Sequence, residues 1–233
     1  MRILMNGHDE LGGGVPRLGI GLTDAELEQL YAPPRTPWLR INMISTVDGS
    51  AAGEDGRSGA INNAADNRVF HLLRGMADAI IVGAGTARAE GYGPADRPLV
   101  LVSRSADVPE KLRGAAPGSV LMATVGAADH LDEARELLGE ENVLVLGTHR
   151  VDLVALKQAL VDRGWTNLLG EGGPHLLRDL IAQGVADELS ATVVPRLVAG
   201  THPRITDGAA IDVPLALELL LEHEGTLLGR WLI

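Results

Sequence analysis

The chain has 233 residues, a formal net charge of −11, 45% hydrophobic residues and only 3% aromatic residues. The length fits one domain with an aliphatic core, and the negative charge argues against a general affinity for nucleic acids or anionic membranes. The chain has no cysteine, which excludes disulfides, thiolate catalysis and cysteine-ligated zinc.

The N-terminal residues show little periodicity. Residues 1–22 are rich in glycine and aperiodic, so we expect them to form an arm. The following "TDAELEQLY" predicts a short helix, with Thr23 as its N-cap and Glu26 at the spacing of a capping box. No basic segment followed by an apolar run marks a signal peptide, and the longest uncharged stretch, 114–128, is too short to cross a bilayer. We therefore expect a cytoplasmic protein.

From residue 38 onward, short apolar runs alternate with helical patterns. The runs are continuous rather than alternating, which is typical of strands in a sheet covered on both faces. We therefore predict an α/β fold with a mostly parallel central sheet and helices on both faces, formed by a single domain (38–233) after an N-terminal arm with a short helix (1–37). The predicted strands are 39–47, 79–83, 98–103, 119–124, 143–146, 167–170 and 188–195, and the predicted helices are 63–76, 151–163 and 174–183.

The stretch "LLGEGGPHLLRDL" (168–180) predicts a strand, a tight turn and a helix. Gly172 and Gly173 can adopt positive φ, and Pro174 suits the first position of a helix. The free N–H groups and positive dipole of that helix start favour a diphosphate, although a simple turn is the alternative. Glu171 would be unfavourable beside a diphosphate, so we expect its side chain to point into an adjoining substrate pocket.

The stretch "AIIVGAGTARAEGYG" (79–93) ends a strand in a glycine-rich turn. A dinucleotide-binding fingerprint would need a third glycine where the chain has Arg88, so that interpretation fails. Gly83 and Gly85 still allow a ligand to approach the backbone, and Thr86 offers a hydroxyl group at a helix start. A tight turn and a ligand-binding loop both remain open.

Three further segments carry polar residues that could bind a ligand. Ser103 and Arg104 follow a buried strand and suit a phosphomonoester such as the 2′-phosphate of NADPH, or belong to a solvated loop. Asp48 precedes a glycine in a polar loop and could be only a turn residue. Arg74 lies on the polar face of a predicted helix, near its C-terminal end. It could interact only with the helix dipole, or it could bind a ligand. The seven histidines show no paired metal spacing, so we predict no metal site.

Taken in this order, these stretches resemble the reductase family of riboflavin biosynthesis, the C-terminal half of the bifunctional deaminase-reductase, over residues 38–232. The resemblance implies a dihydrofolate-reductase-like fold, an NADPH cofactor and a homodimer. The family reaction reduces the ribosyl group of 5-amino-6-(5-phosphoribosylamino)uracil to ribityl. The segments that carry the resemblance are "STVDG" (45–49), Ser58 with "AINN", "LLRGMADAIIVGAGTARAE" (72–90), Ser103, "LLGEGGPHLLRDL" and "VADELSATVVPRLVAG" (185–200).

The resemblance also implies roles for individual residues. The substrate would contact Ser58, Arg74 and Glu171. Nearby negative charge helps hydride addition to an imine, so we expect Glu171 or Asp48 to stabilise the iminium or relay a proton. The residues expected to contact the cofactor are Ile44, Ala60, Gly83, Gly85, Thr86, Glu90, Ser103, Arg104, Gly172, Gly173, Pro174, His175, Leu176 and Leu177.

The chain departs from the family pattern at two places. "EGYGPADRP" (90–98) stands where the bifunctional enzymes carry "D-x-P-x-L-x-x-R", with Arg97 as the available arginine, and Ala60 stands where a tryptophan is frequent. The first departure motivates one alternative, a dihydrofolate or other pteridine reductase. An alternative from a different class is an NADPH-binding protein without turnover.

Overall fold

The computed structural model describes residues 1–7 and 21–233. The strands are β1 (Arg2–Asn6), β2 (Trp38–Thr46), β3 (Ala79–Gly83), β4 (Leu99–Val102), β5 (Val120–Thr124), β6 (Val143–Val145), β7 (Asn167–Gly170), β8 (Glu188–Val194), β9 (Ala216–His223) and β10 (Thr226–Leu232). The α-helices are α1 (Asp24–Leu30), α2 (Ala64–Met76), α3 (Ala84–Glu90), α4 (Leu131–Leu138), α5 (Leu153–Asp162) and α6 (Pro174–Ala182).

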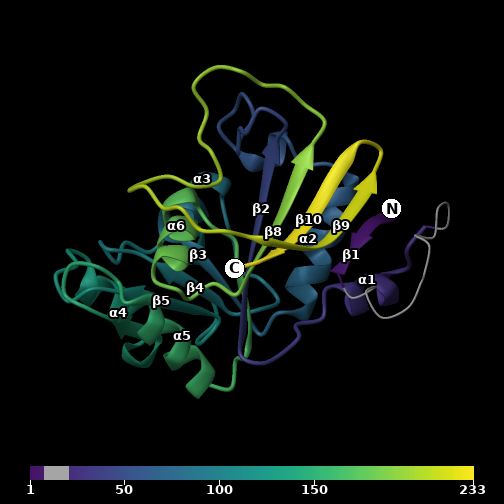
Figure 1. The fold of residues 1–233 in the computed structure, drawn as a ribbon. Helices are drawn as coiled ribbons and strands as arrows, with labels where there is room; N and C mark the ends of the chain where they lie inside the picture. The colour runs from purple at the N-terminus through teal and green to yellow at the C-terminus, as the bar shows by residue number, and fades with distance from the viewer. Residues whose placement is uncertain (8–20) are drawn as a thin grey trace.

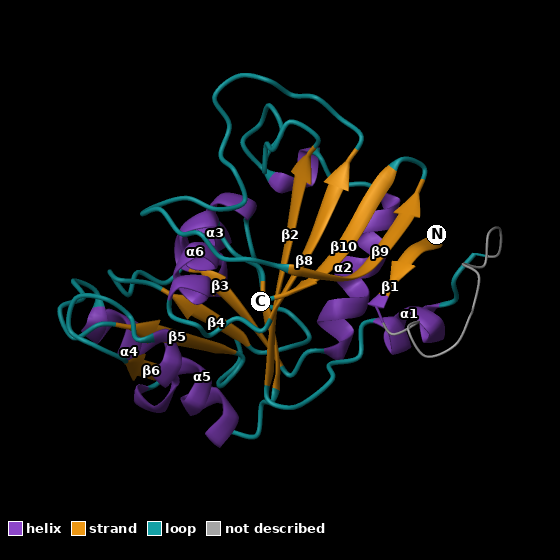
Figure 2. Cartoon of the chain, in the orientation of Figure 1, coloured by secondary structure: helices purple, strands orange, loops and turns teal. Residues whose placement is uncertain are grey.

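All of these strands lie in one sheet, in the order β1-β9-β10-β8-β2-β7-β3-β4-β5-β6 (Figures 1 and 2). The strands from β8 to β6 in this order pair in parallel, and β1, β9, β10 and β8 pair antiparallel. The predicted α/β class and mostly parallel sheet are therefore confirmed.

Helices cover both faces of the parallel part of the sheet. One apolar cluster joins the sheet to α1, α2, α3 and α4, through side chains such as Leu27, Leu73 and Leu138. A second cluster joins the opposite face to α5 and α6, through side chains such as Leu156 and Leu180. Both clusters are almost entirely aliphatic, as the composition predicts. Among the described residues, no helix combines the length and the apolar character needed to cross a membrane.

The structure differs from the sequence prediction at both ends of the chain. The sequence assigns residues 1–22 to an aperiodic arm, but Arg2–Asn6 is the edge strand β1, paired with β9; residues 8–20 lie outside the described part. The sequence also predicts no element after residue 195, whereas β9 and β10 form a hairpin beside β8. The leucine- and glutamate-rich β9 has no strong strand propensity of its own. Its pairing with β1 and β10 decides its state.

A buried ion cluster ties the parallel and antiparallel parts of the sheet together. The Glu188 carboxylate on β8 accepts a hydrogen bond from Nε of Arg40 on β2 at 2.5 Å, and lies 2.9 Å from Nε of Arg230 on β10. All three residues are at most 2% exposed. Buried charges are tolerated only when they are paired in this way, because each unpaired ion would carry a large desolvation cost.

The turn after β7 packs directly against the start of α3. The N–H of Glu171 donates to the carbonyl of Ile81 at 2.9 Å, and the N–H of Gly83 donates to the carbonyl of Gly172 at 2.7 Å. A Cβ atom added to Gly173 would lie 2.3 Å from the Thr86 hydroxyl oxygen. Only glycine at position 173 therefore allows the two segments to approach this closely.

We expect Gly173→Ala to destabilise the protein by about 1–3 kcal/mol, the usual cost of overpacking a close contact. The added methyl group must displace the Thr86 hydroxyl group. Adding Thr86→Ala should recover most of the loss, because the Thr86 Cβ atom lies 3.6 Å from the added Cβ position. Urea denaturation measures the free energy of unfolding.

Gly85→Ala is the matched control for this experiment, because a Cβ atom at Gly85 would meet no atom within 4 Å. It should leave stability unchanged or raise it slightly. Equal stability of Gly173→Ala and the wild type would contradict the proposed close contact.

Candidate active site

Two cavities lie on either side of the turn that connects β7 to α6. The β4 cavity, of about 410 Å³, lies between the end of β4 and the starts of α3 and α6. The α2 cavity, of about 420 Å³, lies between α2, α3 and the end of β2. Gly85, Thr86, Gly173 and Pro174 line both cavities. A long ligand could therefore extend from one cavity into the other across these residues.

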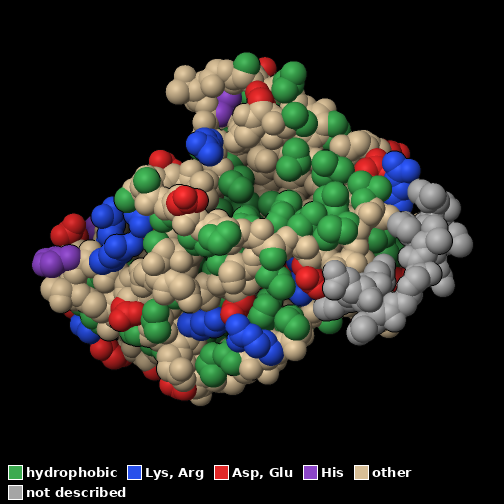
Figure 3. Space-filling model, in the orientation of Figure 1, with side chains coloured by type: hydrophobic (Ala, Val, Ile, Leu, Met, Phe, Trp, Pro, Cys, Tyr) green, Lys and Arg blue, Asp and Glu red, His purple; other side chains and the backbone are tan. Residues whose placement is uncertain are grey.

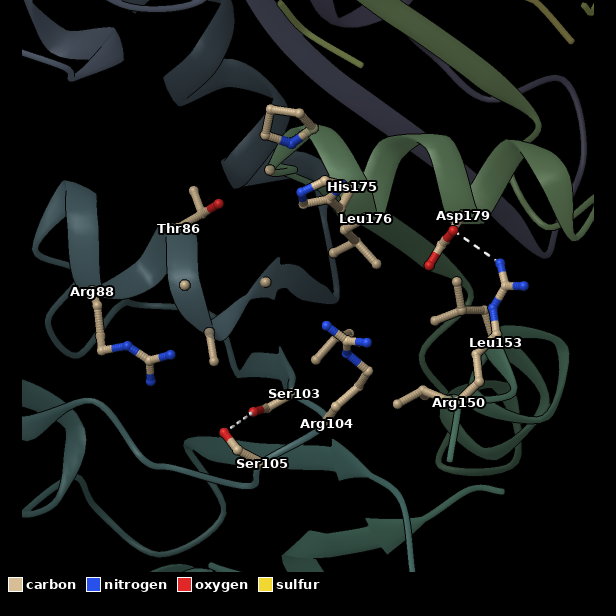
Figure 4. A pocket seen from close by; sticks show the side chains of 17 residues that line it. Thr86, Arg88, Ser103, Arg104, Ser105, Arg150, Leu153, His175, Leu176 and Asp179 are labelled. Carbon is tan, nitrogen blue, oxygen red and sulfur yellow. Dashed lines mark hydrogen bonds and ion pairs between the residues drawn. The ribbon is translucent and has the colours of Figure 1, made fainter. Parts of the chain in front are cut away.

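The β4 cavity holds the polar group predicted after the fourth strand. Ser103, Arg104 and Ser105 line it, and the two serine hydroxyl oxygens lie 3.3 Å apart (Figure 4). Arg104 extends into the space between α3 and α6, and no described residue forms a hydrogen bond or ion pair with its guanidinium group. Arg150 on the opposite side is paired with Asp179 at 2.9 Å. Arg104 is thus a cation available to an anionic ligand.

The α2 cavity is centred on Glu171. Arg74 binds the Glu171 carboxylate in a bidentate manner, with Nε donating to Oε1 at 2.7 Å and Nη2 donating to Oε2 at 2.6 Å. The Tyr92 hydroxyl group donates to the same Oε2 at 2.6 Å. The Glu171 side chain is only 3% exposed, so these two partners neutralise and solvate a carboxylate that water scarcely reaches.

Burial and the charge of Glu171 shift the pKa of Arg74 in opposite directions and the pKa of Tyr92 in the same direction. Burial alone would lower the pKa of Arg74, but the hydrogen bond and negative charge of Glu171 outweigh it and raise that pKa. Burial, followed by the nearby Glu171 charge, raises the pKa of Tyr92 well above its usual range. At neutral pH, therefore, Arg74 is a cation and Tyr92 a neutral phenol that can donate a hydrogen bond.

Two further predicted residues meet at the mouth of the α2 cavity. The backbone N–H of Ser58 donates to the Glu90 carboxylate at 2.9 Å, and both residues line the cavity. This contact connects the loop after β2 with the end of α3, which are distant in the sequence. Because the contact uses the backbone N–H of Ser58, its hydroxyl group does not take part in it, and the residue lines the cavity.

Asp48 lies outside both cavities. Its carboxylate accepts hydrogen bonds from the Thr46 hydroxyl group and from the backbone N–H groups of Val198 and Ala199, at 3.1 and 2.8 Å. The Thr46 contact, followed by the Ala199 N–H, lowers the pKa of Asp48 to about 2. The Asp48 carboxylate therefore holds the segment after β8 in place through Val198 and Ala199.

The structure brings most of the predicted site residues together. Ala60, Gly172 and Leu177 line neither cavity; Leu177 is fully buried in the core beneath α6, and Gly172 shapes the turn with a φ of 78°. The predicted residues that line one or both cavities are Ile44, Ser58, Arg74, Gly83, Gly85, Thr86, Glu90, Ser103, Arg104, Glu171, Gly173, Pro174, His175 and Leu176.

Sequence reasoning misses Tyr92 and Asp66, both of which line the α2 cavity. Tyr92 lies in the segment noted for departing from the family pattern, and its role is apparent only from its contact with Glu171. Asp66 falls in the first turn of α2, where an acid is usual and therefore unremarkable in sequence. Arg97 lines a separate cavity of about 730 Å³. This cavity adjoins the α2 cavity, because Arg74 and Tyr92 line both.

The comparisons with known proteins agree with this geometry. A family model described as the RibD C-terminal domain matches residues 37–226. The 2,5-diamino-6-ribosylamino-4(3H)-pyrimidinone 5′-phosphate reductase of Methanothermobacter thermautotrophicus is 32% identical over 203 residues, covering 82% of this chain and 94% of that protein. The riboflavin biosynthesis protein RibD of Mycobacterium tuberculosis is 32% identical over 220 residues, covering 88% of this chain but only 60% of that protein.

A solved structure shows the same fold. The pyrimidine reductase-like protein of Corynebacterium diphtheriae superimposes with a TM-score of 0.77 at 26% identity, covering 91% of this chain and 98% of that one. Since the family model spans most of the chain and the archaeal relative is matched almost end to end, the chain belongs to the RibD C-terminal domain family.

Proposed function

We propose that this protein is an NADPH-dependent reductase of riboflavin biosynthesis. It converts the ribosyl group of a 6-ribosylaminopyrimidine 5′-phosphate, such as 5-amino-6-(5-phosphoribosylamino)uracil, into a ribityl group. The observation that carries the proposal is the pair of cavities joined at Gly173 and Thr86. One contains Arg104, which no described residue pairs, and the other contains the buried carboxylate of Glu171. The negative net charge and the metabolic family support a cytoplasmic location and a small-molecule partner rather than a nucleic acid or a membrane.

The joined cavities fit a dinucleotide cofactor. Gly85 and Gly173 have no side chain, so the backbone is accessible where the two cavities meet. At this place the first turn of α6 presents free N–H groups that suit a diphosphate. Ser103 and Arg104 then lie at the nucleotide end, and Ile44 at the end that leads into the α2 cavity. When bound, the nicotinamide supplies the hydride for the reduction.

The α2 cavity holds and polarises the substrate. The opened ribosylamino group is an imine, and its reduction places a hydride on C1 and a proton on nitrogen. Arg74, paired on one side with Glu171, can share its remaining N–H groups with the 5′-phosphate. The Glu171 carboxylate favours the positive charge that the nitrogen carries as an iminium. We assign Asp48 to positioning the segment after β8, since it lies outside this cavity.

Glu171→Gln should slow single-turnover oxidation of NADPH by the phosphoribosyl pyrimidine by about 100-fold or more, because the variant loses the charge that stabilises the iminium. The loss of absorbance of the reduced nicotinamide at saturating substrate measures this rate. Glu54→Gln, at an exposed position, is the matched control and should react at the wild-type rate.

An unchanged rate in Glu171→Gln would remove Glu171 from the mechanism. A substrate panel tests the proposal as a whole. Faster turnover of dihydrofolate than of the pyrimidine would make the protein a pteridine reductase. NADPH binding without oxidation by either substrate would make it a binding protein.

The preference for NADPH over NADH should depend on Arg104, because its guanidinium group is free to bind the 2′-phosphate that only NADPH carries. We expect Arg104→Ala to raise the dissociation constant for NADPH by about 10- to 100-fold, the range for one charge-assisted hydrogen-bonded contact. The dissociation constant for NADH should not change. Isothermal titration with both nucleotides measures this difference, and equal weakening of both would place Arg104 elsewhere on the cofactor.

The outer face of the antiparallel strands supports a homodimer. Leu228 on β10 points into the core and is 1% exposed, whereas its neighbour Leu227 is 37% exposed on the opposite face, paired across from Val193 on β8. Figure 3 shows hydrophobic side chains gathered over the region of β8, β10 and β9, with charged side chains mainly at its border. A contiguous apolar patch of this kind is typical of a protein interface, and a second copy of the chain would cover it symmetrically.

Leu227→Glu should convert the dimer into a monomer of 24.5 kDa, because the new charges would face each other or apolar side chains in the interface. Sedimentation velocity at micromolar concentration measures the mass, and circular dichroism checks the fold. Val154→Glu is the control, because Val154 is 57% exposed on α5, away from this patch (Figure 1); this variant should remain dimeric. A wild-type protein that sediments as a monomer would contradict the proposal.

A further inference from the structure

One aromatic side chain at the α2 cavity has no part in the scheme above. Tyr92 follows α3 directly, because Gly91 ends that helix with a φ of 74°. The backbone N–H of Tyr92 donates to the carbonyl of Ala87 at 2.8 Å, and its half-buried ring packs against the apolar cluster to which α2 and α3 contribute. The fold therefore holds both the backbone and the ring of Tyr92 in place.

The hydroxyl group of Tyr92 decides which oxygen of Glu171 can accept a further hydrogen bond. A carboxylate has about four acceptor sites, two on each oxygen. Oε2 of Glu171 accepts both Nη2 of Arg74 and the Tyr92 hydroxyl group, each at 2.6 Å. Oε1 accepts Nε of Arg74 at 2.7 Å. These contacts fill both sites of Oε2, so the remaining acceptor site belongs to Oε1.

The ring of Tyr92 also restrains Arg74. The guanidinium carbon of Arg74 lies 5.4 Å from the centre of the Tyr92 ring and 4.4 Å from the centre of the Phe70 ring. A guanidinium group is attracted to aromatic faces at such distances. Arg74 and Tyr92 are also the two residues that line both the α2 cavity and the cavity of Arg97. Tyr92 therefore borders the α2 cavity and contacts both members of the Arg74–Glu171 pair.

Tyr92 is a hydrogen-bond donor that keeps its proton. Burial, followed by the nearby Glu171 charge, raises the pKa of Tyr92 well above its usual range, so the phenol is neutral at any pH suitable for an assay. The same shift makes Tyr92 a poor source of the proton that the imine nitrogen gains. Its contribution to the reaction therefore passes through Glu171.

We propose that Tyr92 is a positioning residue for the reduction. Its hydroxyl group occupies Oε2 of Glu171, so that Oε1 is the oxygen that meets the iminium nitrogen of the substrate. This inference rests on the proposed function. Without the hydroxyl group, the Glu171 carboxylate would lose one of its three hydrogen bonds and could turn on its remaining contacts with Arg74. Electrostatic stabilisation depends on charge that is already oriented before the reaction, so the reduction would slow.

Tyr92→Phe tests this assignment, because it removes the hydroxyl group and keeps the ring beside Arg74. We expect the single-turnover rate of NADPH oxidation at saturating pyrimidine to fall by about 10- to 100-fold, the effect of losing a hydrogen bond to a charged group. KM for NADPH should not change, because Tyr92 does not line the β4 cavity. Tyr31→Phe is the matched control. It removes the other tyrosine hydroxyl group of the chain, at a buried position that lines neither the α2 nor the β4 cavity, and should react at the wild-type rate.

A double variant separates positioning from a merely structural role. Tyr92→Phe should have no further effect on the rate in a Glu171→Gln background, because its effect passes through the Glu171 carboxylate. Equal losses in both backgrounds, or a wild-type rate in Tyr92→Phe, would overturn the inference and leave the proposed function intact.

The choice of substrate distinguishes failure of this inference from failure of the proposed function. If the wild-type protein turns over dihydrofolate and not the pyrimidine, the proposed function is refuted. The same four proteins then test Tyr92 with dihydrofolate, which also accepts a hydride at a carbon–nitrogen double bond. Turnover of neither substrate by the wild-type protein would refute both the proposed function and the role of Tyr92.

Discussion

The turn between β7 and α6 forms backbone hydrogen bonds with β3, so the pairing of β7 with β3 continues beyond the end of β7. The backbone contacts of Glu171 with Ile81 and of Gly172 with Gly83 extend the ladder past the end of β7. This fixes the direction of the Glu171 side chain and the start of α6 at once. Because Gly173 lies against Thr86, the same turn forms the wall between the two cavities. Both cavities of the candidate site are therefore bordered by one segment.

Each of the two cavities contains an arginine. The protein carries a net charge of −11, so any anionic ligand depends on local cations rather than on a general field. Arg104 provides one at the far side of the β4 cavity. Arg74 provides another in the α2 cavity, where Glu171 holds it in a fixed orientation with both carboxylate oxygens. The two arginines therefore lie in different cavities, on segments that follow β4 and precede β3.

The sequence was sufficient for much of this site, because its segments carry their chemistry locally. The glycines around Glu171 and the serine and arginine after β4 are recognisable from neighbouring residues. Tyr92 and Asp66 were not recognisable, since their significance depends on contacts across the fold. Tyr92 lies 79 positions from Glu171, to which it donates a hydrogen bond. Asp66 acquires its unusual environment only when α2 packs against β8.

The amino-acid sequence alone determined the α/β class, the parallel strands from β2 to β8 and the helix starts at Thr23 and Pro174. Each depends on short-range signals, namely apolar runs, capping residues and turn glycines. The tertiary structure decided the antiparallel edge, where β1 and β9 pair across more than two hundred residues, and the grouping of side chains into two cavities. Strand pairing and the meeting of distant side chains depend on how the whole chain folds, which no local pattern specifies.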